Sequence, residues 1–239
     1  MTNDTTRREF VTAAVAGASA VAMTGASAAG SESKETRMTV APAFQTSTAL
    51  KPLPFDPARL NGLSEKLIRS HWENNYSGSV KALAAVKTRL AQAAGDKDLP
   101  PYVYNDLKRE HLIRTGSVVL HEIYFDNLGG SGKAGAKERE TIAAAFGSFD
   151  AWESEFRRIG AGLGGGSGWV MLGLNEHTRL LENYWMADHA TAPANTRPLL
   201  VMDMYEHSYQ MDFGAAAAKY IEAFFRNIEW EKVAQRLEA

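Results

Sequence analysis

The sequence predicts an α+β fold: an N-terminal antiparallel helical hairpin, followed by a C-terminal domain in which helices flank a small three-stranded antiparallel sheet. In the first half of the 239-residue chain, apolar residues recur at intervals of three and four, the period of an amphipathic helix. Three later segments alternate with a period of two, which is typical of strands, before helical periods return near the C-terminus. Helices that precede a group of strands indicate an α+β chain.

The N-terminal residues have the pattern of an export signal. Arg7 and Arg8 precede a run of Ala, Val, Gly, Thr and Ser, and Ala26-Ser27-Ala28 offers a small-residue cleavage site. We interpret residues 1–28 as a twin-arginine signal peptide and residues 29–52, rich in Ser, Thr, Ala and Pro, as a linker. The run is too poor in Leu, Ile and Phe for stable membrane insertion. We therefore expect export in folded form by the twin-arginine machinery, and a periplasmic or secreted protein.

Two long helices are expected within residues 53–131, the predicted N-terminal domain. The first begins after Ser64, whose hydroxyl suits the N-cap, and carries apolar residues and His71 at helical spacing. The second extends over residues 105–128, and the glycines that follow predict its end. Consecutive helices of this length are expected to pack as an antiparallel hairpin.

Residues 132–239, the predicted C-terminal domain, combine helices with strands. Residues 175–178 have the composition of a hairpin turn between the first two strands. The expected helices are 137–146, 150–163, 215–227 and 229–237, and the expected strands are 169–172, 179–185 and 199–202.

Composition excludes several classes of protein. The chain has no cysteine, which removes disulfide scaffolds, thiolate metal sites and cysteine nucleophiles. Its 26 basic and 28 acidic side chains give a net charge of -2, so the basic surface of a nucleic-acid-binding protein is not expected. Any metal ion must be bound by nitrogen and oxygen ligands.

Four residues form a candidate site for such an ion. Asp203 and His207 are four residues apart where the third strand meets the last helices, a spacing that lets both bind one ion. His71 and His121 each lie in the middle of a mainly apolar helix, where an unpaired imidazole is costly to bury. Three imidazoles and one carboxylate suit iron or manganese with one position left open. The alternative for the helical histidines is a hydrogen-bonded core position.

A longer set of motifs surrounds these four residues. They are Leu120-His121-Glu122-Ile123-Tyr124-Phe125, Phe146-Gly147-Ser148-Phe149, Gly166-Ser167-Gly168-Trp169, Asp203-Met204-Tyr205-Glu206-His207 and Glu229-Trp230-Glu231. In order and spacing they resemble the iron/manganese superoxide dismutase family, from Leu53 to the C-terminus. The resemblance implies an enzyme that acts on superoxide as a homodimer or homotetramer.

The metal ligands follow from the resemblance by position. In that family three histidines and one aspartate bind the metal, which implies one iron or manganese ion per subunit on His71, His121, Asp203 and His207, with solvent as fifth ligand. The implied reaction is a ping-pong disproportionation, in which one superoxide is oxidised to dioxygen and a second is reduced to hydrogen peroxide. The alternative is a non-enzymatic metal-binding protein that keeps the dismutase fold for storage, sensing or partner binding.

Further residues are implied around the ligands. The resemblance implies that Trp169 and Tyr205 line the metal site and that Tyr124 supports it. The alternative for Trp169 is core packing. The family's glutamine that hydrogen-bonds the metal-bound solvent comes either from the second helix, at the position of Ser117, or from the strand hairpin, where His189 is our candidate. The alternative for His189 is a solvated loop residue.

The residues at the substrate gateway depart from the family. Its usual His and Tyr, four and eight residues after the first ligand, are Asn75 and Ser79 here, and its Tyr three residues after the last ligand is Gln210. Both members of a cross-subunit His–Tyr pair have become amides, so we hypothesise an Asn75–Gln210 pair across a dimer. Glu206 matches the residue that bonds the partner subunit's last ligand. Tyr76, one turn before Ser79, is a further gateway candidate, with packing as the alternative.

Overall fold

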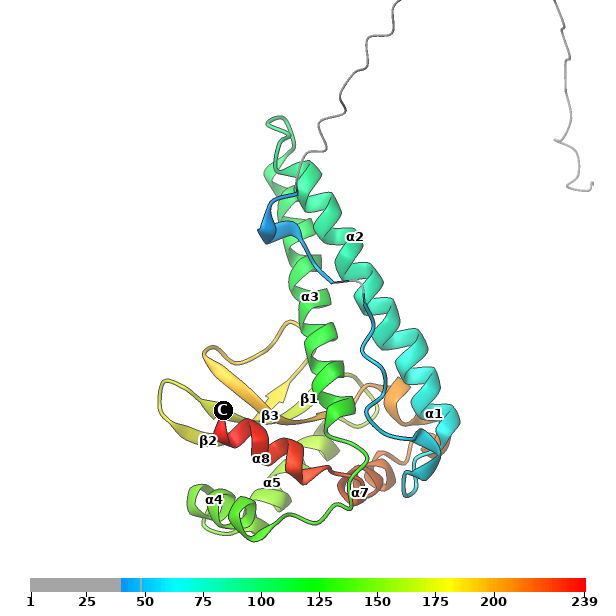
Figure 1. Cartoon of the computed structure of the whole chain (residues 1–239), viewed down its shortest axis with the longest axis vertical. Helices are drawn as coiled ribbons and strands as arrows, with labels where there is room; N and C mark the ends of the chain where they lie inside the picture. Colours follow the sequence, from blue (N-terminus) through cyan, green and yellow to red (C-terminus); the bar gives the residue numbers. More distant parts are fainter. Residues whose placement is uncertain (1–39, 48) are drawn as a thin grey trace, which may run out of the picture. The chain divides into compact units, whose positions relative to one another are not determined.

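Residues 40–47 and 49–239 are described by the computed structural model, and Figure 1 shows their helices and strands. The predicted signal peptide at residues 1–28, with Arg7 and Arg8, and residues 29–39 of the predicted linker lie outside the described residues. Within the described ranges, every helix is too short or too polar to span a membrane.

The first long helix of the hairpin has three parts. They are α1 (Glu65–Ser70), a π-helical segment (His71–Tyr76) and α2 (Ser77–Ala93). Ser64 caps α1 as expected, because its hydroxyl accepts a hydrogen bond from the backbone N–H of Leu67 at 3.0 Å. The wider turns of the π-helical segment begin at His71, and such segments often occur at functional sites.

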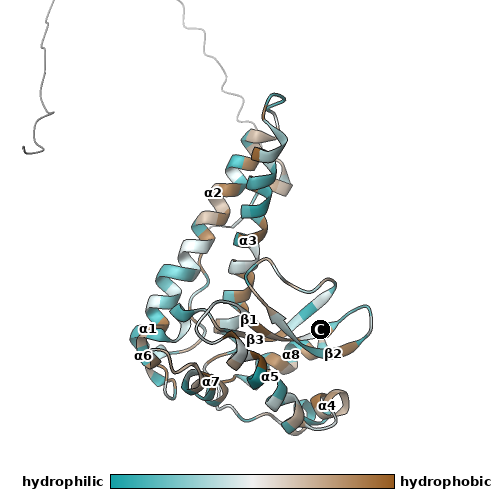
Figure 2. Ribbon diagram, turned by 180° about the vertical axis from the view of Figure 1, so that it is seen from behind, coloured by the Kyte–Doolittle hydropathy of each residue, from teal (hydrophilic) through white to brown (hydrophobic). Residues whose placement is uncertain are grey.

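The second arm of the hairpin is α3 (Pro101–Asp126), which returns beside α2 (Figure 1). It begins four residues before the predicted start at residue 105, because Pro101 occupies the first helical position, where its missing N–H breaks no bond. Gly129 follows the helix with a φ of +98°, a conformation that favours glycine. Hydrophobic and hydrophilic residues are mixed along both helices (Figure 2), as expected when one face of each is exposed.

The C-terminal half contains a three-stranded antiparallel sheet in the order β2-β1-β3. Its strands are β1 (Trp169–Asn175), β2 (Leu180–Met186) and β3 (Thr196–Asp203). The side chain of Asn175 forms the turn between β1 and β2 by accepting hydrogen bonds from two N–H groups, of His177 at 3.0 Å and Thr178 at 3.2 Å. The predicted α+β fold is confirmed. β1 and β3 are longer than predicted, because backbone pairing continues through Gly173 and Pro198, two residue types that are depleted in strands.

Helices cover the sheet. α5 (Phe149–Leu163) packs against β1, and α3 packs against β3. The other helices of this half are α4 (Ala136–Phe146), α6 (Gln210–Phe213), α7 (Ala217–Arg226) and α8 (Trp230–Glu238), of which α6 is not predicted by the sequence pattern. One buried cluster joins both halves and includes Ile68, Trp152 and Phe224. The division into domains after residue 131 falls in the loop between α3 and α4 and stays a prediction.

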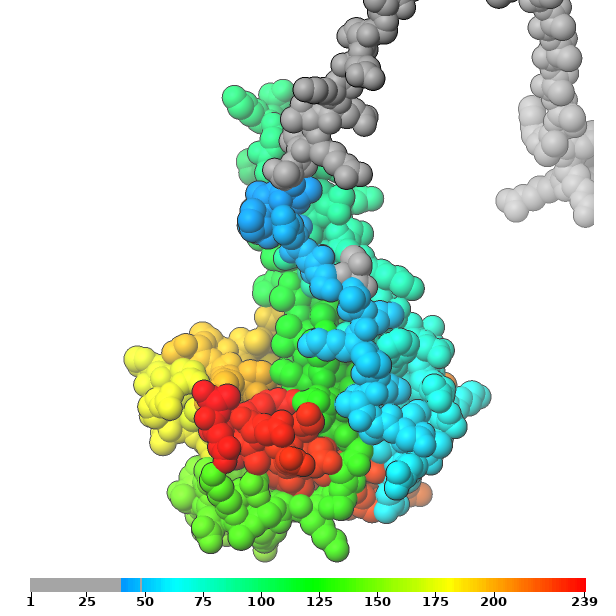
Figure 3. Space-filling model, in the orientation of Figure 1, coloured from blue at the N-terminus to red at the C-terminus, as the bar shows by residue number. Residues whose placement is uncertain are grey.

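The segment before α1 lies along the outside of the hairpin, and Figure 3 shows it in blue against the green of α3. The backbone carbonyl of Lys51 accepts a hydrogen bond from the indole of Trp72 at 3.0 Å. The backbone N–H of Lys51 donates to the hydroxyl of Tyr76 at 3.1 Å. That hydroxyl donates in turn to Glu122 on α3, at 2.9 Å. Tyr76 therefore ties this segment to both arms of the hairpin.

Candidate metal centre

Asp203 is the last residue of β3, and its neighbours fix its orientation. Its Oδ1 accepts a hydrogen bond from the backbone N–H of Tyr205 at 2.9 Å. Its backbone carbonyl accepts two more, from the hydroxyls of Ser208 at 2.8 Å and Tyr220 at 2.7 Å. His207 lies in the short 3-10 turn Glu206–Ser208 that follows. These bonds leave the second carboxylate oxygen, Oδ2, free for other partners.

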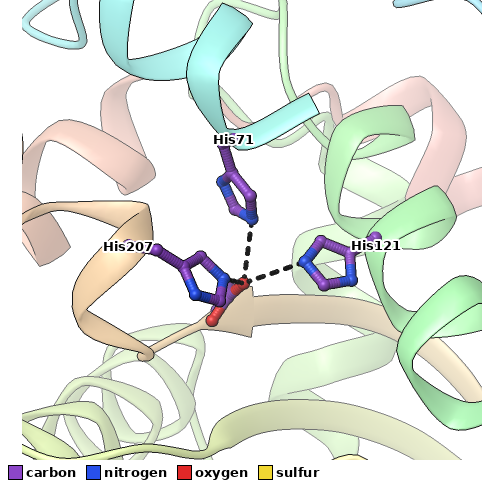
Figure 4. Close-up of side chains that lie close together, drawn as sticks. His71, His121 and His207 are labelled. Atoms are coloured by element: carbon purple, nitrogen blue, oxygen red, sulfur yellow. Dashed lines mark hydrogen bonds and ion pairs between the residues drawn. The ribbon is translucent and has the colours of Figure 1, made fainter. Parts of the chain in front are cut away.

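The imidazoles of three histidines surround that oxygen. His71 begins the π-helical segment, and His121 lies on α3. The Nε2 atoms of His71 and His207 are each 3.1 Å from Oδ2 of Asp203, and that of His121 is 3.7 Å away. One ligand atom from each of the four residues lies within 4.8 Å of all the others. Figure 4 shows the three histidines converging from separate segments of the chain.

The donor set of this cluster fits a metal cation. In the described part of the chain, the buried Nε2 atoms of His71 and His121 have no hydrogen-bond partner. Nδ1 of His121 donates to the backbone carbonyl of Ser117 at 2.7 Å, which leaves Nε2 unprotonated with its lone pair free for an ion. Buried polar atoms without partners are costly, and a shared cation would satisfy both. Three imidazoles and one carboxylate suit iron or manganese.

Burial and charge hold the cluster in the protonation states that metal binding needs. Burial lowers the pKa of His121 to about 3 and also lowers the pKa of His71, so both rings are neutral at pH 7. Burial acts to raise the pKa of Asp203, but the neighbouring imidazoles of His207 and His71 outweigh it and hold that pKa below its ordinary value. The carboxylate is therefore ionised beside the neutral rings of His71 and His121.

Aromatic side chains enclose the cluster. The ring of Trp169 meets His121 edge to face, with ring centres 5.2 Å apart, and the ring of Tyr205 stacks on His207 at 5.3 Å. Tyr124 lies 5.2 Å from His71. Trp169 and Tyr124 are fully buried, so this side of the cluster is closed to water.

His189 lies beside the cluster, in the loop between β2 and β3. The indole N–H of Trp169 donates to its Nδ1 at 3.0 Å, and its ring stacks on Tyr205 with centres 4.7 Å apart. Because an indole can only donate, Nδ1 is the acceptor and the proton of the neutral ring is on Nε2. Burial lowers the pKa of His189, which favours this neutral form. The ring centre is 5.8 Å from that of His121, so His189 is packed within the site.

A polar cavity of about 420 Å³ opens over the cluster. Its lining includes the gateway candidates Asn75 and Ser79, together with Ser117, His189 and the ligand rings of two histidines. The hydroxyl oxygens of Ser79 and Ser117 are 2.7 Å apart, and that of Ser117 lies 3.3 Å from Nδ1 of His121. Two small hydroxyls thus occupy the places where the resemblance implies a Tyr and, in one alternative, a Gln.

The remaining predicted site residues lie elsewhere. Tyr76 lines a separate pocket and bonds Glu122 and Lys51, so it is a packing residue and not a gateway group. The packing alternative is the one that the structure shows, because the hydroxyl of Tyr76 is held between Glu122 on α3 and the backbone of Lys51. Glu206 and Gln210 are exposed.

Some residues of the site lie outside the sequence motifs. Asn74 and Arg114 line the cavity, Tyr220 bonds the carbonyl of Asp203, and Gly116 lies against the backbone of His189. A helical projection from His121 indicates Arg114, because residues seven positions apart share a helix face. Nothing in the sequence pattern indicates Gly116, whose neighbour is distant along the chain.

Comparison with known proteins gives the family. Residues 134–236 match the family model described as iron/manganese superoxide dismutases, C-terminal domain. An iron superoxide dismutase of Cupriavidus metallidurans is 49% identical over 190 residues, which cover 80% of this chain and 96% of the relative. An iron superoxide dismutase of Aquifex aeolicus is 34% identical over 189 residues (76% and 87%), and a manganese superoxide dismutase of Haloferax volcanii is 29% identical over 195 residues (79% and 94%). The chain therefore belongs to the iron/manganese superoxide dismutase family.

Proposed function

We propose that this protein is a superoxide dismutase, an oxidoreductase that converts two superoxide ions and two protons to dioxygen and hydrogen peroxide with one iron or manganese ion per subunit. The observation that carries the proposal is the buried cluster of His71, His121, Asp203 and His207 at the base of a polar cavity. Relatives named as iron or manganese superoxide dismutases match most of the chain.

The four ligands would hold the ion and set the charge around it. When bound, the ion supplies one-electron chemistry, taking an electron from one superoxide and giving it to a second. Asp203 contributes one negative charge and the neutral imidazoles contribute none, an intermediate total that suits cycling between two oxidation states. The backbone carbonyl of Ser117 and the N–H of Tyr205 keep His121 and Asp203 in place.

Residues above the cluster orient solvent and supply protons. The bond from Trp169 leaves the Nε2–H of His189 as a donor within the site, and we assign it the role of the family's glutamine toward solvent at the metal. The hydroxyls of Ser79 and Ser117 form a polar wall that holds water in the cavity, the source of the protons needed for hydrogen peroxide.

A homodimer or homotetramer is part of the proposal. Glu206 and Gln210 are exposed on either side of the ligand His207. Asn75 is half-buried in the lining of the cavity, where an amide pair with the partner subunit's Gln210 would close the cavity mouth. Light scattering on the purified full chain measures the assembly, and a monomer would contradict this part of the proposal.

Export is proposed separately, on the sequence pattern of Arg7, Arg8 and the small residues that follow. Cell fractionation tests it. We expect the wild type in the periplasm or the medium, and the double variant Arg7→Lys, Arg8→Lys in the cytoplasm. If the wild type and the double variant were found in the same cell fractions, export by the twin-arginine route would be contradicted.

The activity is tested by loading the full chain separately with iron and with manganese, then measuring metal content and superoxide removal. We expect about one ion per subunit and removal far above that of the metal-free protein. Bound metal without activity would instead favour the non-enzymatic alternative of storage, sensing or partner binding. The ratio of activities with the two metals decides which one the protein uses.

A further inference from the structure

The helix α3 and the loop that carries His189 touch through their backbones at one place. A Cβ atom added to Gly116 would lie 1.8 Å from the carbonyl oxygen of His189, 2.9 Å from its carbonyl carbon and 3.6 Å from its Cα. Real Cβ atoms essentially never come within 3.0 Å of such atoms. No side chain therefore fits at position 116 unless one of the two segments moves.

The loop is the segment that would move. α3 carries the ligand His121 and packs against both α2 and β3. The loop is held largely by a turn within itself, in which Asp188 accepts hydrogen bonds from the N–H of Ala190 at 2.8 Å and the hydroxyl of Thr191 at 2.9 Å. A methyl group at position 116 would displace this turn as a unit by about 1 Å or more.

Such a displacement would release the ring of His189. The ring is held by the hydrogen bond from Trp169, 3.0 Å long, and by stacking on Tyr205 with an angle of 11° between the planes. A bond of that length lengthened by about 1 Å is no longer a hydrogen bond. Nδ1 would then lose its fixed donor, and Nε2–H its fixed direction.

We infer that Gly116 is a positioning residue, whose missing side chain sets how closely His189 approaches the metal ligands. Its effect on catalysis rests on the proposed function, because His189 is there the donor to solvent at the metal. Its effect on the placement of His189 is independent of any activity.

The test compares Gly116→Ala with the matched control Gly162→Ala in the metal-loaded full chain. Gly162 is also helical, in α5, and a Cβ there meets nothing within 4 Å. In crystal structures we expect the distance from Trp169 Nε1 to His189 Nδ1 to exceed 3.5 Å in Gly116→Ala and to stay near 3.0 Å in the control. An unchanged distance in Gly116→Ala would overturn the inference.

Solution measurements separate positioning from general damage. At equal metal content, we expect Gly116→Ala to lower the dismutase rate by roughly 10- to 100-fold, the range typical of residues that orient groups around a metal, and to change the ferric absorption and EPR spectra. Combining it with His189→Ala should give the activity of His189→Ala alone. A further loss of the same size in that background would contradict positioning through His189.

Two other results are also informative. If the wild type shows no dismutase activity with either metal, the proposed function fails, while the crystallographic comparison still decides the inference. If Gly116→Ala does not fold, the wild-type crystal structure decides. A separation of Gly116 Cα and His189 O near 3.3–3.6 Å supports the backbone contact, and one beyond about 4 Å overturns it.

Discussion

Two of the four metal ligands and much of the cavity lining come from the same two helices, yet ligands and lining differ in how closely they follow the family. His71 and His121 match its ligands, whereas Asn75, Ser79 and Ser117 replace the larger side chains that the resemblance implies near the substrate. Four donor atoms must share one ion, so few arrangements of ligands succeed. A cavity wall has to be polar, and several combinations of amides and hydroxyls meet that demand. The comparison between the ligand cluster and the cavity wall can be tested by substitution on each side.

The largest effect is expected within the cluster. His121→Ala removes one of four ligands and leaves Nε2 of His71 and the carboxylate of Asp203 buried without their shared cation. We expect metal content near background and a loss of activity beyond the roughly 100-fold range of outer-shell substitutions. The control is His177→Ala, in the exposed turn after β1, which should keep the metal content and the activity of the wild type. Normal metal content in His121→Ala would disprove the ligand assignment.

An intermediate effect is expected where the cluster meets the cavity. Trp169→Phe keeps an aromatic ring beside His121 but removes the donor to Nδ1 of His189. We expect full metal content with activity lowered roughly 10-fold. Trp185→Phe on β2 is the control, since that indole is 58% exposed. Equal activities of the two variants would show that the indole hydrogen bond has no part in turnover.

A small effect is expected in the cavity wall itself. Ser117→Ala removes the hydroxyl near Ser79 and His121, while its backbone carbonyl still holds His121. We expect full metal content, activity within about threefold of the wild type, and a free energy of unfolding lower by about 1 kcal/mol. Ser131→Ala, in an exposed loop, serves as the control. A loss of activity of tenfold or more would show that the hydroxyl takes part in proton supply.

The smallest effect on activity is expected from Tyr76→Phe. The change removes hydrogen bonds to Glu122 and the backbone of Lys51, outside the cavity. We expect unchanged turnover and a free energy of unfolding lower by about 1–2 kcal/mol, measured by denaturant unfolding. If turnover fell while the free energy of unfolding stayed normal, Tyr76 would have a role at the substrate gateway.

Residue types and spacing were sufficient to predict the fold class and to bring the four candidate ligands together. Each ligand can be identified from its local sequence, as a histidine in an apolar helix or as an Asp and a His four residues apart. The pattern left gateway and packing open for Tyr76, because the partners that decide it, Lys51 and Glu122, are distant along the chain. Gly116 could not be predicted either, since its importance comes from a loop that only tertiary packing brings to α3.

The π-helical segment His71–Tyr76 holds more residues per turn than the helices on either side of it. The six residues of this segment turn through about the same angle as five residues of an α-helix, so deleting one of them would restore a regular helix and leave α2 in nearly the same orientation. Ser79 would stay in the cavity, whereas a deletion within the regular helix that follows would rotate the residues beyond it by about 100°. The first helix of the hairpin could thus lose a residue next to the first ligand with less rotation of the side chains beyond it than a loss anywhere in α2 would cause.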